Sequence, residues 1–436
     1  MTENTFDLVG AILADPATGT FRPQDLRIKG GIIEQIRPPG EKPDAGPIPV
    51  IDLSGAILAP GLTDLHVHLR EPGGEENERI ESGLKAAAAG GFTTICVMPN
   101  SGKVADHPDV IRYVLSKASS VALAEVLPIA AITKGLAGRE IVDFAALLEA
   151  GAIAFSDDGM PVTDSACMEE ALYRAKALQV PLIDHCEDPG LKREGLMHEG
   201  EVSRQLGLPG ISAVSEAVPV ARNILLAQKT GARMHIAHLS TEEGVSLLQY
   251  ARSRNIPVTA EATPHHICLT DRELLDYNTN AKVSPPLRSE RHRQAVAQAV
   301  KEGLITCIAT DHAPWPEAAK AKPFPQAPNG ISGLETALAA VWDTLVVKGG
   351  MPPLDLLARF ILGPAAVLGR PPAVLKPGSP ANLVAIDPQL RKEVKPQEFY
   401  SQGKNSPLAG KVLQGWPVLT VYQGRIVMER GIVRET

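Results

Sequence analysis

Two histidines separated by one residue, His66 and His68, are the side chains of this sequence best suited to chemistry. They lie in the alternating stretch Leu62–Pro72. Successive side chains of a strand point to opposite faces, so both imidazoles would project from one face, where they could bind a metal ion. Arg70 follows where the strand should give way to a loop. The same pattern also fits a polar strand with two solvated histidines, so the rest of the chain must decide.

Further polar residues follow other short apolar runs, at the predicted ends of buried strands. They are Asn100, Asp157, Asp158, His185, His238 and Asp311. Histidine nitrogens and carboxylate oxygens together suit zinc, and a set of this size predicts two ions in preference to one. Asp157 and Asp158 would point to opposite sides, so we expect one of them to bridge the ions. The spacing alone leaves open which one.

The elements that would position these residues alternate along the chain. Short apolar, β-branched runs, which read as strands, occur at Leu62–His68, Thr93–Met98, Glu125–Ala130, Ala152–Phe155, Pro181–His185, Arg233–His238, Val258–Glu261 and Thr306–Asp311. Helical patterns follow them at Asn77–Ala89, Pro108–Ala118, Arg139–Ala150, Ser165–Leu178, Glu216–Thr230, Glu242–Ser253, Glu290–Lys301 and Leu334–Val347. This order predicts an α/β fold, a (β/α)8 TIM-like barrel whose site lies at the carboxyl ends of the strands. A doubly wound open sheet is the alternative, but its glycine-rich fingerprint is missing.

Both ends of the chain have a different texture. Residues Phe6–Ile57, Gly378–Asp387 and Val418–Met428 are rich in β-type residues and lack a helical pattern of useful length. We therefore predict a small β-sandwich domain assembled from both termini, residues 1–58 plus 366–436, beside a catalytic barrel of residues 59–365. The segment Ala313–Gly330, after the eighth strand, is expected to be a long functional loop.

The other histidines are expected to play structural parts. His235 is an odd number of residues from His238, so we expect it to face away from the site and to be packed or exposed. His312 adjoins Asp311 and should point away from the barrel axis, where it could donate to a metal ligand. Surface positions are predicted for His107, His198 and His292. Structural positions are predicted for His265 and His266, although these two could instead line the mouth of the barrel.

Composition is that of an ordinary globular protein. The 436 residues are 44% hydrophobic and 21% charged, and the formal net charge of −7 offers no basic footprint for nucleic acid. No apolar run is long enough to cross a bilayer, and Met1–Asp7 lacks the layout of a signal peptide. The five cysteines are odd in number and widely spaced, so we expect reduced thiols in a cytoplasmic protein.

The candidate ligands predict hydrolytic chemistry. Two zinc ions that share a carboxylate can lower the pKa of a bridging water, so that hydroxide forms near neutral pH. Asp311, beside that water, could be both ligand and proton shuttle. Arg70 and Asn100 carry donors suited to a substrate carboxylate, although Arg70 could instead form an internal ion pair with Glu71 or Glu75. We therefore predict a hydrolase for an amide-like bond in an acidic small molecule.

A series of motifs extends this interpretation over nearly the whole chain. The motifs are H-V-H-L-R-E-P-G-G at His66–Gly74, A-A-A-A-G-G-F-T-T at Ala86–Thr94, M-P-N at Met98–Asn100, F-S-D-D-G at Phe155–Gly159, H-C-E-D at His185–Asp188, A-H-L-S-T at Ala237–Thr241, P-P-L-R at Pro285–Arg288, A-T-D-H-A-P at Ala309–Pro314, G-L-E-T at Gly333–Thr336 and G-K-N-S-P at Gly403–Pro407. In this order they resemble the dihydroorotases of the amidohydrolase superfamily, and most of all the type I branch. The resemblance implies reversible, zinc-dependent cyclisation of N-carbamoyl-L-aspartate to L-dihydroorotate in de novo pyrimidine biosynthesis.

The resemblance also implies roles for single residues. The ligands of two Zn²⁺ ions would be His66, His68, Asp158, His185, His238 and Asp311, with Asp158 and a hydroxide as bridges. Asp311 would be the general base in hydrolysis and the general acid in cyclisation. Arg70, Asn100 and Ser284 would contact the substrate.

The chain departs from the family pattern at two positions. Ser284 stands where the family often has asparagine, and a serine can still form a hydrogen bond. Trp315 stands where the family often has a histidine that helps to hold the substrate. An indole cannot accept a hydrogen bond, so either Lys320 or Lys322 supplies another donor or the substrate differs.

Two alternatives stay open. A dihydropyrimidinase, hydantoinase or allantoinase would commonly bridge its metals with a carboxylated lysine at the end of the fourth strand, but no lysine lies between Lys134 and Lys176. A non-catalytic dihydroorotase-like subunit of aspartate carbamoyltransferase would typically have lost metal-binding histidines, which this chain keeps. We expect a small-molecule substrate and a homo-oligomer, with association with that transferase left open, and neither nucleic acid nor a membrane as partner.

Overall fold

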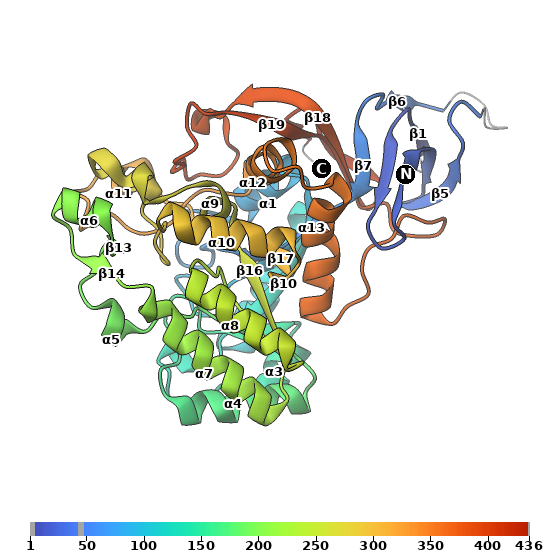
Figure 1. Ribbon diagram of the computed structural model, residues 1–436. Coiled ribbons are helices and arrows are strands. Elements are labelled where there is room, and N and C mark those ends of the chain that lie inside the picture. Colours follow the sequence, from blue (N-terminus) through green and yellow to red (C-terminus); the bar gives the residue numbers. More distant parts are fainter. Residues whose placement is uncertain (1–4, 42–47, 435–436) are drawn as a thin grey trace.

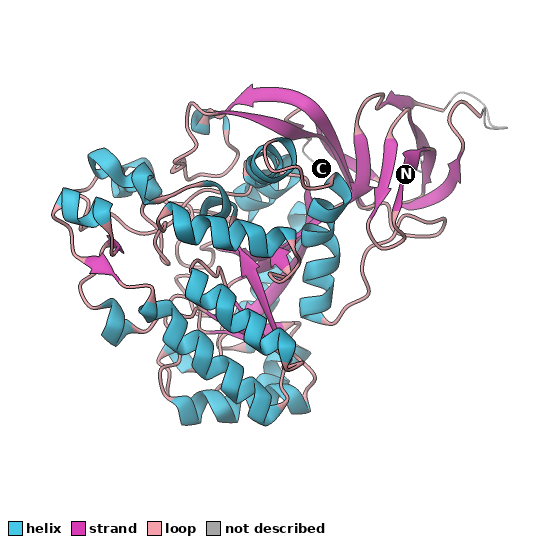
Figure 2. Cartoon of the chain, viewed as in Figure 1, coloured by secondary structure: helices cyan, strands magenta, loops and turns pink. Residues whose placement is uncertain are grey.

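An eight-stranded parallel sheet, covered by helices, forms the centre of the computed structural model, which describes residues 5–41 and 48–434 (Figures 1 and 2). Its strands are β8 (Leu62–Val67), β9 (Phe92–Val97), β10 (Glu125–Ala130), β11 (Ala154–Ser156), β12 (Leu182–Asp184), β15 (Met234–Ile236), β16 (Val258–Ala262) and β17 (Cys307–Ile308). A parallel bridge from Val67 to His312, beyond β17, joins the two edges. The predicted barrel is confirmed, and each predicted run overlaps one of its strands.

The covering helices match the eight predicted helical segments, except that the last helix, Pro353–Leu368, has no predicted counterpart. They are α1 (Ile80–Ala89), α2 (Pro108–Val121), α3 (Phe144–Glu149), α4 (Ser165–Ala177), α7 (Val214–Thr230), α8 (Glu242–Ser253), α10 (Glu290–Lys301), α12 (Ala337–Val341) with the π-helical turn η4 (Trp342–Val347), and α13 (Pro353–Leu368). Side-chain caps fix several starts, because Asp143, Asp164 and Thr241 accept hydrogen bonds from the first-turn N–H groups of α3, α4 and α8. No helix of the described residues is both long and apolar enough to span a membrane.

Short elements decorate the rim of the barrel and have no counterpart in the sequence prediction. They are α5 (Pro189–Lys192), β13 (Met197–His198), α6 (Glu201–Leu206), β14 (Gly210–Ile211), α9 (Pro264–Cys268) and α11 (Glu317–Lys320). None is long enough to show a periodic hydrophobic pattern. Two of them end at a lysine: α5 ends at Lys192 and α11 ends at Lys320.

Segments from both ends of the chain form two further sheets. One has the order β5 (Ile32–Arg37), β4 (Asp25–Lys29), β1 (Thr5–Val9) and β6 (Val50–Asp52); the other has the order β21 (Ile432–Val433), β20 (Arg425–Glu429), β19 (Val412–Tyr422), β18 (Leu383–Glu393), β7 (Ile57–Pro60), β2 (Ile12–Asp15) and β3 (Thr20–Pro23). Leu8, Leu26, Leu58, Ala385 and Val421 are buried together between them. The predicted β-sandwich from both termini is therefore present (Figure 1).

Two details of this region bear on the predictions. The stretch Val418–Met428, expected to be rich in β-structure, is a hairpin, because Gln423 and Gly424 have φ values of 48° and 71° and reverse the chain between β19 and β20. The domain boundaries at residues 58 and 366 stay a prediction, and helix α13 continues to Leu368. Within Met1–Asp7, residues 1–4 lie outside the described part of the chain.

Candidate metal centre and active site

The carboxyl ends of the barrel strands bring four histidines around the carboxylate of Asp158. Its Oδ1 lies 3.3 Å from His66 Nε2 and 3.7 Å from both His185 Nδ1 and His238 Nε2. Its Oδ2 lies 3.5 Å from His68 Nε2. All five side chains are buried. Residues from strands far apart in the sequence therefore converge on one carboxylate.

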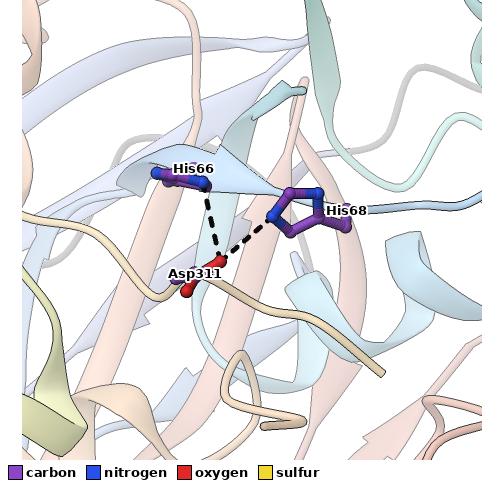
Figure 3. Close-up of side chains that lie close together, drawn as sticks. All are labelled: His66, His68 and Asp311. Atoms are coloured by element: carbon purple, nitrogen blue, oxygen red, sulfur yellow. Dashed lines mark hydrogen bonds and ion pairs between the residues drawn. The ribbon is translucent and has the colours of Figure 1, made fainter. Parts of the chain in front are cut away.

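Asp311 approaches the same cluster from the loop after β17. Its Oδ1 lies 3.0 Å from His68 Nε2 and 3.5 Å from His66 Nε2 (Figure 3). Asp311 and His238 have φ values of 48° and 32°, in the left-handed region that residues other than glycine rarely adopt. Such strain persists only where the surrounding structure enforces it, and it is concentrated at functional sites. The structure thus brings all six predicted ligands together.

The neighbouring Asp157 takes no part in this cluster. Its carboxylate accepts hydrogen bonds from the backbone N–H groups of Ile132 and Thr133, at 2.8 and 3.0 Å, and from the Thr133 hydroxyl. Burial raises the pKa of Asp157 to about 6 although these hydrogen bonds oppose the rise. Burial would also raise the pKa of Asp158, but the positive charge of His66 and the close approach of the His238 and His66 rings hold it well below its usual range. Geometry therefore selects Asp158, which the spacing could not do.

Several polar atoms of the cluster lack a hydrogen-bond partner within the described chain and are placed so that they could bind a metal ion. His66 Nε2, Asp158 Oδ1 and His238 Nδ1 are buried and form no hydrogen bond with the described residues. Possible ligand atoms of His66, His68 and Asp311 lie within 4.8 Å of one another, and so do those of His66, Asp158 and His238. Buried polar atoms are rarely left without a partner, and nitrogen and oxygen donors at these separations are those that zinc takes. The residues present are compatible with a metal site.

Glu261, at the end of β16, holds His66 from behind. Its Oε1 lies 2.8 Å from His66 Nδ1 and its Oε2 lies 3.1 Å from His235 Nε2. His235 is buried, as predicted, and its Nδ1 lies 2.8 Å from Thr259 Oγ1. A carboxylate behind an imidazole fixes which ring nitrogen faces the metal. Sequence analysis did not single out Glu261, although its place as the last residue of the seventh predicted strand was a usable signal.

Asn100 links two of the candidate ligands. Its Oδ1 lies 2.7 Å from His68 Nδ1, and its Nδ2 donates to Asp158 Oδ2 at 3.0 Å. It also donates to the Asp158 carbonyl oxygen at 3.1 Å. The residue expected to bind substrate thus orients both a histidine and the central carboxylate.

A network of hydrogen bonds and ion pairs connects Lys192, Ser284 and Glu187 to His185. Glu187 Oε2 lies 3.5 Å from His185 Nε2 and accepts a hydrogen bond from Ser284 Oγ at 2.8 Å. Lys192 Nζ donates to Ser284 Oγ at 2.8 Å and to Glu187 at 2.5 Å. Burial would raise the pKa of Glu187, but His185 and Lys192 hold it well below its usual range. Lys192, which no sequence pattern pointed to, is thus part of the site.

A cavity of about 300 Å³ opens beside the cluster, a volume suited to a small molecule. Its walls include five of the six candidate ligands. The other polar or aromatic residues that line it are Arg70, Asn100, Lys192, Ser284, Trp315 and Asn329. The candidate substrate contacts therefore share one cavity with the candidate metal ligands.

Comparison with known proteins decides the family. Residues 55–244 match the family model described as Dihydro-orotase-like. The dihydroorotase of Pelotomaculum thermopropionicum is 45% identical over 98% of this chain and 99% of its own length, and that of Solibacter usitatus is 44% identical over 95% and 96%. The chain belongs to the dihydroorotase family. It is accordingly an enzyme of the amidohydrolase class.

Solved structures agree on the fold of this family member. The L-hydantoinase (dihydropyrimidinase) from Arthrobacter aurescens superimposes with a TM-score of 0.87 at 24% identity and covers 98% of this chain and 97% of its own. A D-hydantoinase (dihydropyrimidinase) from Thermus sp. gives 0.85 at 22% identity, over 99% and 97%. Identities this low show the shared fold alone.

In this member of the dihydroorotase family, Trp315 lies against Arg70. The Arg70 Cζ is 5.0 Å from the centroid of the Trp315 ring. Arg70 forms no ion pair or hydrogen bond through its guanidinium within the described residues, so the internal pair with Glu71 or Glu75 is not formed. Glu71 instead accepts from the Ile80 N–H, at 2.9 Å, and from the Tyr113 hydroxyl.

Neither proposed loop donor reaches the cavity. Lys320 Nζ is buried and donates to the carbonyl oxygens of Lys282 and Pro328, and Lys322 is exposed. These lysines lie elsewhere because the loop Ala313–Gly330 folds back on Lys282, which is itself buried. The structure therefore leaves Trp315 without a replacement from either lysine.

The remaining histidines correct some expectations. The His312 ring points away from the cluster, as predicted, but it contacts no candidate ligand: its Nδ1 accepts from the Gly333 N–H at 3.1 Å and its Nε2 lies 3.4 Å from Glu78. His198 and His292 were expected at the surface, and this is wrong, because their rings pack against one another under the rim elements. His265 and His266 are buried, and His107 is exposed.

Proposed function

We propose that the chain is a dihydroorotase, which interconverts N-carbamoyl-L-aspartate and L-dihydroorotate in de novo pyrimidine biosynthesis. Curated dihydroorotases 41–45% identical over nearly the full length carry this proposal. The residues that follow β11 argue against a hydantoinase or dihydropyrimidinase. Asp158 occupies the centre of the cluster, and no lysine lies between Lys134 and Lys176 to take its place.

The proposal includes two zinc ions per chain. Asp158 would lie between them, and the other ligands would be His66, His68, His185, His238 and Asp311. The unsatisfied buried atoms of the cluster and its nitrogen and oxygen donors support this assignment. When bound, such ions lower the pKa of a water molecule and polarise a substrate carbonyl. The retention of every one of these histidines argues against a purely structural subunit.

Asp311 would carry the proton. It lines the cavity, and although burial would raise the pKa of its carboxyl, the charges of His66 and His68 hold it well below the usual range. The ionised carboxylate would accept a proton from the attacking water in hydrolysis and deliver it to the departing amide nitrogen. In cyclisation the same oxygen would take the proton from that nitrogen and return it to the leaving water.

The substrate carboxylate would bind to Arg70. Its guanidinium has no hydrogen-bond acceptor among the described residues, and a planar fork of donors matches a carboxylate. Asn100 and Ser284 line the same cavity and are proposed as further contacts. Because they already bond to His68 and Glu187, they would use their remaining hydrogen-bonding capacity.

The setting of the enzyme is part of the proposal. We infer a cytoplasmic protein, since all five cysteines are free thiols. We also infer a homo-oligomer, because Val214, Val218 and Leu225 of α7 are 44–57% exposed. Aspartate carbamoyltransferase is the other candidate to cover this face. The proposed domain division remains residues 1–58 with 366–436 and residues 59–365.

The test is a paired assay with metal analysis. Purified protein should contain about two zinc ions per chain by mass spectrometry and should hydrolyse L-dihydroorotate in preference to dihydrouracil, hydantoin and allantoin. Asp311→Asn should bind metal yet lose nearly all turnover. A preference for an uncharged ring would overturn the assignment to pyrimidine synthesis, and a metal-free protein without turnover would favour the structural subunit.

A further inference from the structure

Trp315 is held in place at both ends of the residue. Its indole N–H donates to the Asn329 carbonyl oxygen at 2.7 Å, and its backbone N–H donates to Asn405 Oδ1 at 3.0 Å. Asn405 Nδ2 also donates to the carbonyl oxygens of Ala313 and Gly330, at the two ends of the loop. The position of the ring is therefore set by the loop and does not depend on the cavity.

The loop that carries Trp315 is itself fastened to the barrel. Lys282 Nζ donates to the carbonyl oxygens of Phe324 and Ala327, at 2.7 and 2.8 Å. The Gly330 N–H donates to the Lys282 carbonyl oxygen at 2.9 Å. These buried bonds make the aromatic face a fixed wall of the cavity.

The Trp315 ring is the contact that can support the Arg70 guanidinium. The Arg70 backbone has a φ of 58°, its Nε is buried without a hydrogen bond, and its guanidinium has no protein acceptor among the described residues. Asp158 and Asp311 attract it electrostatically, yet it forms no ion pair with either. The face of the Trp315 ring, 5.0 Å from Cζ, is the contact that can keep the cation away from these two carboxylates.

We propose that Trp315 is the positioning residue for the substrate carboxylate. Its ring supports one face of the Arg70 guanidinium and leaves the edge with the N–H donors directed to the cavity. The carboxylate is then bound by Arg70 on an aromatic platform. This deepens the proposed function and rests on it: the platform selects a cyclic amide that bears a carboxylate over an uncharged ring.

The experiment compares Trp315→Phe with Trp315→Leu on L-dihydroorotate. Phenylalanine keeps an aromatic face, so its KM should stay within about threefold of the wild type; leucine keeps apolar bulk without the face, so its KM should rise about tenfold, with kcat within about twofold. The matched control is Trp416→Leu, because Trp416 also stacks on a cation, Lys392 at 5.1 Å, but in the terminal domain. Its KM should be unchanged.

A double-mutant cycle tests the route of the effect. If Trp315 acts through Arg70, Trp315→Leu should leave KM unchanged within about twofold in an Arg70→Gln background. Binding of N-carbamoyl-L-aspartate, measured by calorimetry, should weaken in parallel with KM while the metal content stays constant.

The outcomes separate the two proposals. A Trp315→Leu enzyme with normal KM, or the same loss in the Arg70→Gln background, would overturn the role of Trp315 and leave the dihydroorotase assignment intact. A Trp315→Phe enzyme as impaired as Trp315→Leu would also overturn it, because the aromatic face would then not matter. Wild-type protein that does not act on L-dihydroorotate would overturn both.

Discussion

Asp157 and Asp158 are consecutive in the sequence, yet their carboxylates lie on opposite sides of the chain where strand β11 ends. Asp157 accepts hydrogen bonds from the backbone of Ile132 and Thr133, and Asp158 lies among the four histidines. Consecutive side chains of an extended segment point to opposite sides, and the two aspartates follow this rule just beyond the strand end. Asp157 thus links the end of β11 to the backbone of Ile132 and Thr133, and Asp158 contacts the candidate metal ligands.

Substitution of Asp158 and substitution of Asp157 by asparagine should have different effects. Asp158→Asn removes the charge that the candidate metal ligands surround, so we expect loss of metal and a fall in kcat of about a hundredfold or more. Asp157→Asn should keep its metal but lower the melting temperature, because an amide replaces a carboxylate that accepts from Thr133. Metal analysis and thermal melting of both variants check this, and equal metal loss in both would contradict it.

Glu261→Gln should weaken metal binding without unfolding the protein. The amide would hold His66 and His235 less strongly, and loss of such a supporting carboxylate typically costs about 10–100-fold in metal affinity. Competition with a chromophoric chelator measures the affinity directly. The matched control is Glu335→Gln, since Glu335 is half-buried and, within the described part of the chain, accepts hydrogen bonds from the backbone of Tyr400 and Ser401 alone; its metal affinity should be normal.

Lys320 should make stability depend on pH. Burial and the nearby charge of Lys282 lower the pKa of Lys320 from 10.5 to about 7. Between these values the unfolded chain binds more protons than the folded chain, so stability contributed at this site rises as the pH increases from about 7. The neutral amine still has two N–H bonds for the carbonyl oxygens of Lys282 and Pro328.

Thermal melting of wild type and Lys320→Met between pH 6.5 and 9.5 tests this linkage. The wild type should gain melting temperature relative to the variant as the pH rises, because the cost of a buried charge disappears. Parallel curves over the whole range would show that Lys320 stays protonated in the folded protein.

Metal removal should lower stability but leave the fold. The candidate ligands bury unpaired atoms that a metal would satisfy, and a ligand that binds only the folded state stabilises it by mass action. Protein treated with a chelator should therefore melt several degrees lower, keep its far-ultraviolet circular dichroism, and recover both melting temperature and activity with added zinc. A melting temperature that ignores zinc would contradict a metal centre formed by these residues.

The sequence predicted what depends on strand order. His66, His185 and His238 each stand at the end of a recognisable strand, and parallel strands bring such ends to one rim. The spacing alone could not choose between Asp157 and Asp158, because either parity satisfies the pattern. The family resemblance implied Asp158, and the structure places its carboxylate among the histidines. Contacts across the fold, such as the stacking of Trp315 on Arg70, leave no local signal in the chain.

The same limit explains the missed residues. Lys192 lies at the end of a four-residue helix, too short for a periodic pattern, and its contact with Ser284 depends on two loops from different βα units. Lys320 looked like a free loop donor, since a sequence does not reveal that a cation will be buried against backbone carbonyls. Tertiary packing decided these positions.

The pairing of β7 with β18 has a consequence for synthesis of the chain on the ribosome. Ile57–Pro60 leads directly into the first barrel strand, but its antiparallel partner, Leu383–Ile386, is translated only after the whole barrel. Until β18 is synthesised, the edge of β7 that pairs with it stays unpaired, and unpaired strand edges promote association with other chains. Late-translated β18 and β19 thus act as the closing step, and a ribosome that stalls before them would release a chain prone to aggregation.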